Sequence, residues 1–360
     1  MQAETKQNKP VETKQNKSVR RRRLIGGLVL ILFLVAALAG WWAYRLVGMP
    51  NFLPGKNVYI YIDQTKNFDQ LCRQLQDSAG CRRIRTFKTL ANLLKYPQSM
   101  HTGRYKVESG MSNLALLNDL RRGHQAATRI TFHAVRLKED LAERLSESLM
   151  LEKDDLLALL NDSLYCDSLG FTPQTIPALF IPNTYEVYWN IPADKLMRRM
   201  KREYDAFWTT QRRAKAAATG LTPVEASILA SIVEEETAAP DEYPIVAGLY
   251  INRLQAGIPL QADPTVKFAL GNFGLQRILF EHLEIDSPYN TYKYAGLPPG
   301  PLRIPSARAI DAVLNHTRHR YFYMCAKEDF SGRHNFAVTL AQHNRNAARY
   351  RAELDRRKIR

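Results

Sequence analysis

The spacing of apolar residues separates one long apolar run near the N-terminus from an amphipathic remainder. Residues 24–44 carry no charge and, as a helix, are long enough to cross a hydrocarbon core of about 30 Å. Four arginines, residues 20–23, precede the run, and aromatic residues close it as at a membrane interface. The pattern predicts a transmembrane helix whose basic end stays in the cytoplasm. A cleaved signal peptide is the alternative, although its apolar stretch usually has about 7–15 residues.

Residues 1–18 are polar and repetitive, and they are predicted to be disordered. After the apolar run, residues 56–62 alternate as a strand does, and later spacings of i, i+3, i+4 and i+7 predict helices. Nothing in this part has catalytic spacing, so we interpret it as a packing or binding module. The other expected elements are helices over 68–75, 87–94, 112–122 and 137–149, and a strand over 128–134.

Residues 150–215 are predicted to be mostly helical, with amphipathic runs around 153–161 and 195–208. Between these runs, PNTYEVYWN at 182–190 is aromatic and polar and lacks the pattern of an ordinary core strand. Aromatic faces stack well on sugar rings, but such a cluster also occurs in plain packing. Both interpretations stay open.

The segment 222–236 predicts a capped helix with one carboxylate inside its apolar face. Thr222 and Glu225 form a capping-box pattern around a proline at the first helical position. At 100° per residue, Glu236 lies among the apolar residues Leu229, Ile232 and Val233. The opposite side, expected to be solvated or hydrogen-bonded, holds Ser227, Ser231, Glu234 and Glu235.

The position of Glu236 matters because a carboxyl group among aliphatic side chains is desolvated, which raises its pKa. Such a group holds a proton near neutral pH and can act as a general acid. A glutamate bonded to buried backbone or to arginine is the alternative, and the helix alone leaves both interpretations open.

Three later stretches concentrate Asn, Gln, Tyr, Thr and His among turns. These side chains hydrogen-bond sugar hydroxyl and acetamido groups, and polar aromatic loops around one buried acid indicate a carbohydrate cleft. The stretches read LYINRLQAGIPLQADPTVKFALG at 249–271, SPYNTYKYAGLPPG at 287–300 and HNFAVTLAQHN at 334–344.

Net charge and cysteine content exclude few classes of partner or site. The formal net charge is +16, of which residues 1–23 hold +6 and the remainder +10. A positive remainder suits a polyanionic partner such as nucleic acid, anionic lipid or cell wall, or is general surface charge. The four cysteines form no CxxC pair, which argues against zinc. A disulfide between Cys72 and Cys81 is a hypothesis for an exported chain.

Four motifs, ASIVEEET, INRL…PLQADPTV, YNTY…GLPPGP and HNF…T…HN, follow one another in the order and spacing of a known family. Over about residues 222–350 the chain resembles the endolytic murein transglycosylases of the MltG (YceG-like) type. Weaker similarity at GRY, residues 103–105, and at PNTYEVY extends through most of the exported part. The resemblance implies cleavage of the MurNAc–GlcNAc bond within glycan strands, with Glu236 as the catalytic acid.

The resemblance also implies which residues line the cleft around Glu236. Asp263 precedes Pro264 and could equally cap a helix. His334 and His343 are a candidate metal pair that a carboxylate mechanism does not require, so no metal or cofactor is expected. The candidate substrate-binding residues are Glu234, Asn252, Gln261, Asp263, Tyr289, Asn290, Thr291, Tyr292 and Asn344.

We therefore expect an α+β protein in which a central buried helix carries the catalytic glutamate. Its expected parts are a cytoplasmic basic tail (1–23), a transmembrane helix (24–44), a LysM-like α/β module (45–135), a helical connecting region (136–221) and a mixed α/β catalytic YceG-like domain (222–360). The expected location is the cell inner (plasma) membrane, with the catalytic domain outside the cytoplasm. The expected partners are peptidoglycan strands, the membrane and cell-wall synthesis proteins, with no nucleic acid.

Three functions stay open at this point. A lytic transglycosylase needs a single carboxyl group and leaves 1,6-anhydro-MurNAc ends. A hydrolase of the muramidase type uses two carboxylates about 5–9.5 Å apart, and Asp263 is the candidate for the second. The third alternative is a non-catalytic wall-binding scaffold with a degenerate cleft.

Overall fold

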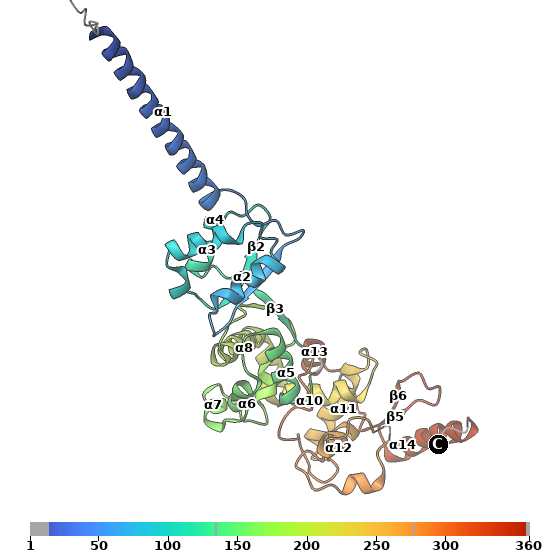
Figure 1. Ribbon diagram of the computed structural model, residues 1–360. Coiled ribbons are helices and arrows are strands. Elements are labelled where there is room, and N and C mark those ends of the chain that lie inside the picture. Colours follow the sequence, from blue (N-terminus) through green and yellow to red (C-terminus); the bar gives the residue numbers. More distant parts are fainter. Residues whose placement is uncertain (1–13, 134, 276, 358–360) are drawn as a thin grey trace, which may run out of the picture. The chain divides into compact units, whose positions relative to one another are not determined.

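The computed structural model describes residues 14–133, 135–275 and 277–357 (Figure 1). Its contacts divide the chain into two compact units, Met1–Ala126 and Ala127–Arg360. The boundary falls before the expected one at 135, because the strand that begins at Thr128 pairs within the second unit.

The first unit begins with α1 (Lys14–Val47), which contains the expected span. Within residues 20–47, an 18-residue window reaches a mean hydropathy of 2.6, and none of that window is buried within the protein, so α1 can cross a membrane by length and composition. The expected disorder over 1–18 is wrong for residues 14–18, which are helical, and residues 1–13 lie outside the described residues. Lysine and arginine favour helix, which allows α1 to continue into the basic segment.

The rest of the first unit is a two-stranded antiparallel sheet with helices packed on it. Its elements are β1 (Val58–Ile62), α2 (Phe68–Asp77), α3 (Ile84–Leu93), η1 (Tyr96–Gln98), β2 (Gly103–Val107) and α4 (Asn113–Arg122). α4 agrees with the helix expected over 112–122: Ser112 accepts the Ala115 amide at its start, and Gly123 adopts the left-handed conformation at φ +67° at its end. β2 was not predicted.

The core of the first unit includes the end of α1. Leu46 is buried with Phe52 and Phe87, and the Asn113 side-chain amide donates to the Leu46 carbonyl at 2.8 Å. Cys72 and Cys81 are free thiols near this core, so the disulfide hypothesis does not hold in the structure. Burial raises the pKa of the Cys72 thiol to about 11.

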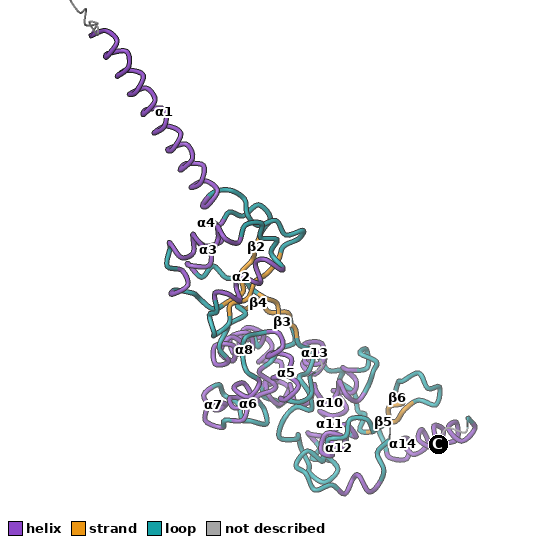
Figure 2. The backbone as a smooth tube through the Cα atoms, viewed as in Figure 1, coloured by secondary structure: helices purple, strands orange, loops and turns teal. Residues whose placement is uncertain are grey.

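The second unit is mostly helical, as the tube in Figure 2 shows, and its strands form two short antiparallel pairs, β3–β4 and β5–β6. Its elements are β3 (Thr128–Thr131), α5 (Lys138–Ser148), α6 (Lys153–Asn161), α7 (Ser163–Ser168), η2 (Ile176–Leu179), β4 (Thr184–Val187), α8 (Ala193–Phe207), α9 (Thr210–Ala218), α10 (Pro223–Glu236), α11 (Tyr243–Gln255), α12 (Asp263–Leu270), η3 (Phe280–Glu284), α13 (Ala307–Leu314), β5 (Tyr323–Ala326), β6 (His334–Ala337) and α14 (Leu340–Arg356).

The aromatic segment 182–190 contains a strand after all. β4 pairs with β3, and the Tyr185 ring is buried and stacks on Phe132 with ring centroids 5.4 Å apart. Tyr185 is therefore a packing residue, whereas Tyr188 is exposed.

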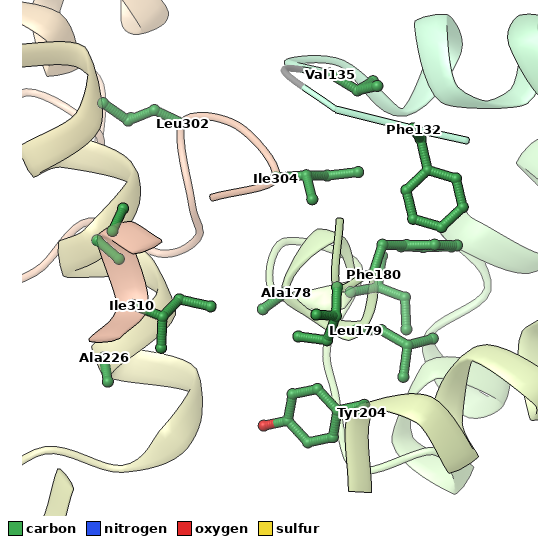
Figure 3. Close-up of a cluster of buried hydrophobic side chains, with 14 of the residues drawn as sticks. Phe132, Val135, Ala178, Leu179, Phe180, Tyr204, Ala226, Leu302, Ile304 and Ile310 are labelled. Carbon is green, nitrogen blue, oxygen red and sulfur yellow. The ribbon is translucent and has the colours of Figure 1, made fainter. Parts of the chain in front are cut away.

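One hydrophobic core runs through the whole second unit, so the helical region 136–221 and the region 222–360 are packed together. Figure 3 shows how the segment after the GLPPGP turn joins the two parts. Leu302 lies on the α10 side, and Ile304 points toward Phe132. The Ile304 amide also donates to the Val135 carbonyl at 2.8 Å.

The central helix α10 is buried on all sides over 226–233. Its predicted capping box between Thr222 and Glu225 is confirmed. The side opposite Glu236, expected to be solvated or hydrogen-bonded, is hydrogen-bonded: Ser227 and Ser231 are fully buried, and their hydroxyls donate to backbone carbonyls. The Ser231 hydroxyl also accepts the Leu302 amide at 2.9 Å. The polar residues thus fasten neighbouring segments to the helix instead of facing water.

Candidate active site

Glu236 is the last residue of α10, where the buried helix opens onto a cavity. The residue as a whole is half-buried, but its Oε2 atom is buried and has no hydrogen-bond partner among the described residues. Burial, together with the nearby negative charge of Asp263, raises the pKa of Glu236 to about 8, from an ordinary value of 4.5. The carboxyl group is thus protonated at neutral pH, as its place on the helical wheel predicts.

The cavity beside Glu236 has a volume of about 260 Å³ and is lined by polar and aromatic side chains. α11 supplies one wall, the turn before α12 supplies the second, and β5 and α14 supply the third. The lining residues other than Glu236 are Leu249, Tyr250, Arg253, Leu260, Gln261, Tyr292, Tyr323, Met324 and His343.

Two residues of α11, three positions apart and therefore on one helix face, line the cavity beside Glu236. Tyr250 is buried and its hydroxyl donates a hydrogen bond to the Glu236 carboxyl group. Burial, with Glu236 as neighbour, keeps the pKa of Tyr250 well above its ordinary value, so the hydroxyl remains a donor. This bond favours the ionised form of Glu236 and partly offsets the desolvation.

Arg253 connects three separate segments around the cavity. Its Nε donates to the Pro259 carbonyl at 2.9 Å, Nη1 to the Phe322 carbonyl at 2.8 Å and Nη2 to Gln261 Oε1 at 2.6 Å. The rigid guanidinium fork suits such divergent acceptors better than an ammonium group does. Arg253 therefore fixes the positions of the walls relative to Glu236.

Gln261 has a φ of +53°, a left-handed conformation that a side chain other than glycine's rarely adopts. Its amide donates to the Thr291 carbonyl at 3.1 Å, which holds the strained turn in place. Local strain of this kind gathers at functional sites, and here it directs the Gln261 side chain to the cavity wall.

Tyr292 and Asp263 form the remaining polar pair at the cavity. The Tyr292 hydroxyl donates to Asp263 Oδ1 at 2.6 Å, and burial followed by the Asp263 charge raises the pKa of Tyr292. Asp263 is exposed at the first turn of α12. It stands near enough to Glu236 to disfavour the Glu236 carboxylate.

Asn290 and Thr291, both expected in the cleft, are buried supports of the turn before it. The Asn290 side-chain amide donates to the Leu283 and Ile285 carbonyls at 2.8 and 2.9 Å. The Thr291 hydroxyl lies 2.8 Å from that of Thr265 and accepts the Ala262 amide. Neither side chain lines the cavity, because both are taken up by turn backbone.

Asn252 and Glu234 also act on neighbouring segments. The Asn252 amide donates to the His319 and Tyr321 carbonyls, and Glu234 accepts the Ser306 amide at 2.9 Å. Tyr289 lines a different cavity, next to Phe268. Asn344 is exposed on α14 beside His343, which is the residue that lines the site.

Seven lining residues were not proposed as cleft residues from the sequence: Leu249, Tyr250, Arg253, Leu260, Tyr323, Met324 and His343. Tyr250 and Arg253 share a helix face one turn apart within the quoted motif, and that spacing could have revealed them. His334 and His343, the candidate metal pair, have different neighbours. His334 contacts Glu242 at 3.0 Å, whereas His343 packs on Tyr323 with ring centroids 5.6 Å apart.

An acid kept protonated by burial beside a polar, aromatic cavity is the general-acid arrangement of glycoside-cleaving enzymes. The chain belongs to the YceG-like family, whose model matches residues 60–349. It is 27% identical over 287 residues to an endolytic murein transglycosylase of Bacillus subtilis (strain 168), covering 74% of this chain and 78% of that protein.

A second relative, an endolytic murein transglycosylase of Streptococcus pneumoniae serotype 2, is 25% identical and is matched over 89% of this chain. The chain spans 64% of the length of that relative. The crystal structure of a yceG-like protein from Listeria monocytogenes has a TM-score of 0.53 and 23% identity. The match covers 81% of this chain and 99% of that one, and it shows the shared fold.

Proposed function

We propose that this protein is a membrane-anchored lytic transglycosylase that cleaves MurNAc–GlcNAc bonds within murein strands, with Glu236 as its catalytic acid. The observation that carries the proposal is the protonated Glu236 carboxyl group at the wall of a cavity large enough for part of a sugar chain. Two relatives that match most of the chain are named endolytic murein transglycosylases.

In the proposed reaction, Glu236 donates its proton to the glycosidic oxygen as the bond from that oxygen to C1 of MurNAc breaks. The carboxylate then removes the proton from the 6-hydroxyl of the same MurNAc, and that oxygen bonds to C1. The product is a 1,6-anhydro ring, and Glu236 is protonated again, so no water is consumed. Tyr250 stabilises the transient carboxylate through its hydrogen bond, and intramolecular attack benefits from proximity.

Asp263 supports the enzymatic alternative, a muramidase. It is the second carboxylate near Glu236, and a hydrolase would use it on the opposite side of the scissile bond. Its bond from Tyr292 and its exposure favour instead a role in shaping the cavity wall. Substitution Asp263→Asn separates the two, because a hydrolase would lose activity and the proposed transglycosylase keeps it.

For location, we infer that α1 anchors the protein in the cell inner membrane with its N-terminus in the cytoplasm. The support is the basic segment before the span, since positive charge marks the cytoplasmic side. The first unit would be the LysM-like, wall-binding module of the family. A non-catalytic scaffold is disfavoured because a purely binding cleft does not need a buried, protonated acid.

The test uses the full chain in detergent with purified sacculi, and mass spectrometry of the released fragments. Wild-type protein should give 1,6-anhydro-MurNAc ends, each lighter by one water than a reducing end. Glu236→Gln should abolish release, because the amide keeps the size but has no transferable proton. The matched control is Glu147→Gln on the exposed side of α5, which should retain activity. Reducing ends that carry oxygen-18 from labelled water would refute the transglycosylase chemistry.

A further inference from the structure

Helix α12 forms a wall of two more cavities beside the candidate active site. Pro264, Lys267 and Phe268 share one helix face and line a cavity of about 90 Å³. Phe268 also lines a second cavity of about 220 Å³. At the start of the same helix, Asp263 accepts the hydroxyl of Tyr292, which lines the cavity of Glu236. The two cavities share Arg136 and Phe268 in their lining and are named the α12 groove from here on.

The α12 groove carries an excess of positive charge. Its charged lining consists of Arg136, Lys138 and Lys267 against the single carboxylate of Glu235. Glu235 is already shared, since it accepts Arg136 and Arg303 at 2.7 Å each. Lys267 has no hydrogen-bond or ion-pair partner within the described ranges. An anionic group entering the groove would therefore meet an unneutralised cation.

The uncharged part of the groove consists mainly of aromatic and proline residues, with Asn161 and Gln174 beside them. The rings of Phe268 and Tyr289 lie 4.7 Å apart between centroids, and Pro173, Pro177 and Pro301 line the same cavity. Gly300 of the GLPPGP turn packs so closely against the Gln174 carbonyl and the Tyr289 hydroxyl that a Cβ atom there would clash. This close approach explains a glycine at that position and fixes Tyr289 at the groove rather than at Glu236.

We propose that the α12 groove binds the peptide substituent of the murein strand through a free carboxylate of that peptide. This inference rests on the proposed function. The sugars of the strand are uncharged, and the lactyl group of MurNAc is amidated where a peptide is attached, so free carboxylates belong to the peptide. Cations next to apolar walls suit such a peptide better than they suit a bare sugar chain.

The test compares two substrates of equal size with the full chain in detergent. One is a set of strands with intact peptides, and the other is the same set after conversion of the peptide carboxylates to amides. The readout is the ratio of kcat/KM for the two, so that any effect of a substitution on Glu236 itself cancels. Wild-type protein should prefer the carboxylate form by about fivefold, the size of one partly screened ion pair.

Lys267→Gln should reduce that ratio to near one, mainly through KM, and Arg136→Gln should reduce it as well. The matched control is Lys195→Gln, an exposed residue of α8 outside the groove, which changes net charge equally and should keep the preference. A wild-type ratio near one, or a ratio that survives both groove substitutions, overturns the inference. Since the ratio is read whatever the chemistry of the ends, reducing-end products would instead refute the proposed reaction.

Discussion

Substitution Glu236→Gln should make the second unit more stable at neutral pH while it removes activity. The folded protein holds the Glu236 proton up to about pH 8, whereas the unfolded chain releases it near 4.5. Between these values only the unfolded state ionises, so the free energy of unfolding of the wild type falls as pH rises. Below pH 4.5 both states are protonated, and this loss of stability disappears. Glutamine does not titrate, so the Glu236→Gln protein does not lose stability in this way at any pH.

The size of this stability difference follows from the difference between the pKa of Glu236 in the folded and in the unfolded protein. At pH 7 the unfolded group is about 2.5 units above its pKa, and each unit corresponds to 1.36 kcal/mol, which gives about 3 kcal/mol. The expected observation is that the stability of Glu236→Gln relative to wild type rises by about that amount from pH 4 to pH 7. Taking the change with pH removes any constant effect of placing an amide in the site.

The assay is a urea titration of the full chain in detergent, read by pulsed hydrogen exchange of peptides from α10, which report the second unit alone. Glu147→Gln on α5 is the control and should track the wild type, because an exposed carboxylate keeps its hydration. A difference between Glu236→Gln and wild type that does not change with pH would mean that Glu236 is ionised in the folded protein. The general-acid argument would then fail.

Three further predictions concern rate, packing and topology. The kcat/KM for glycan cleavage should fall as pH rises above about 8, where Glu236 loses its proton, and a profile flat to pH 10 would contradict this. Arg253→Lys should lower the free energy of unfolding by about 2 kcal/mol or more, measured by urea titration, because one ammonium group cannot reach three divergent acceptors. A phosphatase fused to the C-terminus should be active in cells and a cytoplasmic reporter silent, and the reverse pattern would overturn the proposed orientation.

Local patterns predicted the elements well where a single helix or strand determines its own ends. The capping box of α10 follows from the Thr222–Glu225 pair, which acts within one turn, and the helix expected over 112–122 is α4. β2 and β4 were missed because each is short and is stabilised mainly by its partner strand, β1 or β3. For the side of α10 opposite Glu236, the sequence left solvation and hydrogen bonding open, because polarity alone does not distinguish water from a buried backbone partner, and the structure shows the hydrogen bonds.

The acid itself could be found from the helix, but its surroundings could not. Glu236 could be identified from the helical period of α10 and from the apolar residues that share its face. Arg253 and Gln261 come together through a turn whose left-handed residue is not a glycine, and no sequence signal marks such a turn. Asn290 and Thr291 show the reverse error, since polar residues in a motif can serve the backbone of a turn as well as a ligand.

The way α1 ends has a mechanical consequence. The helix reaches Val47 without a break, Leu46 is packed in the core of the first unit, and Asn113 is bonded to its carbonyl. Spanning helices tilt by about 20° on average and adjust that tilt to bilayer thickness. Because no flexible linker separates α1 from the core of the first unit, a change in the tilt of the helix must rotate the unit with it. With α1 spanning a bilayer as proposed, lipid composition would therefore set the angle between the first unit and the membrane surface.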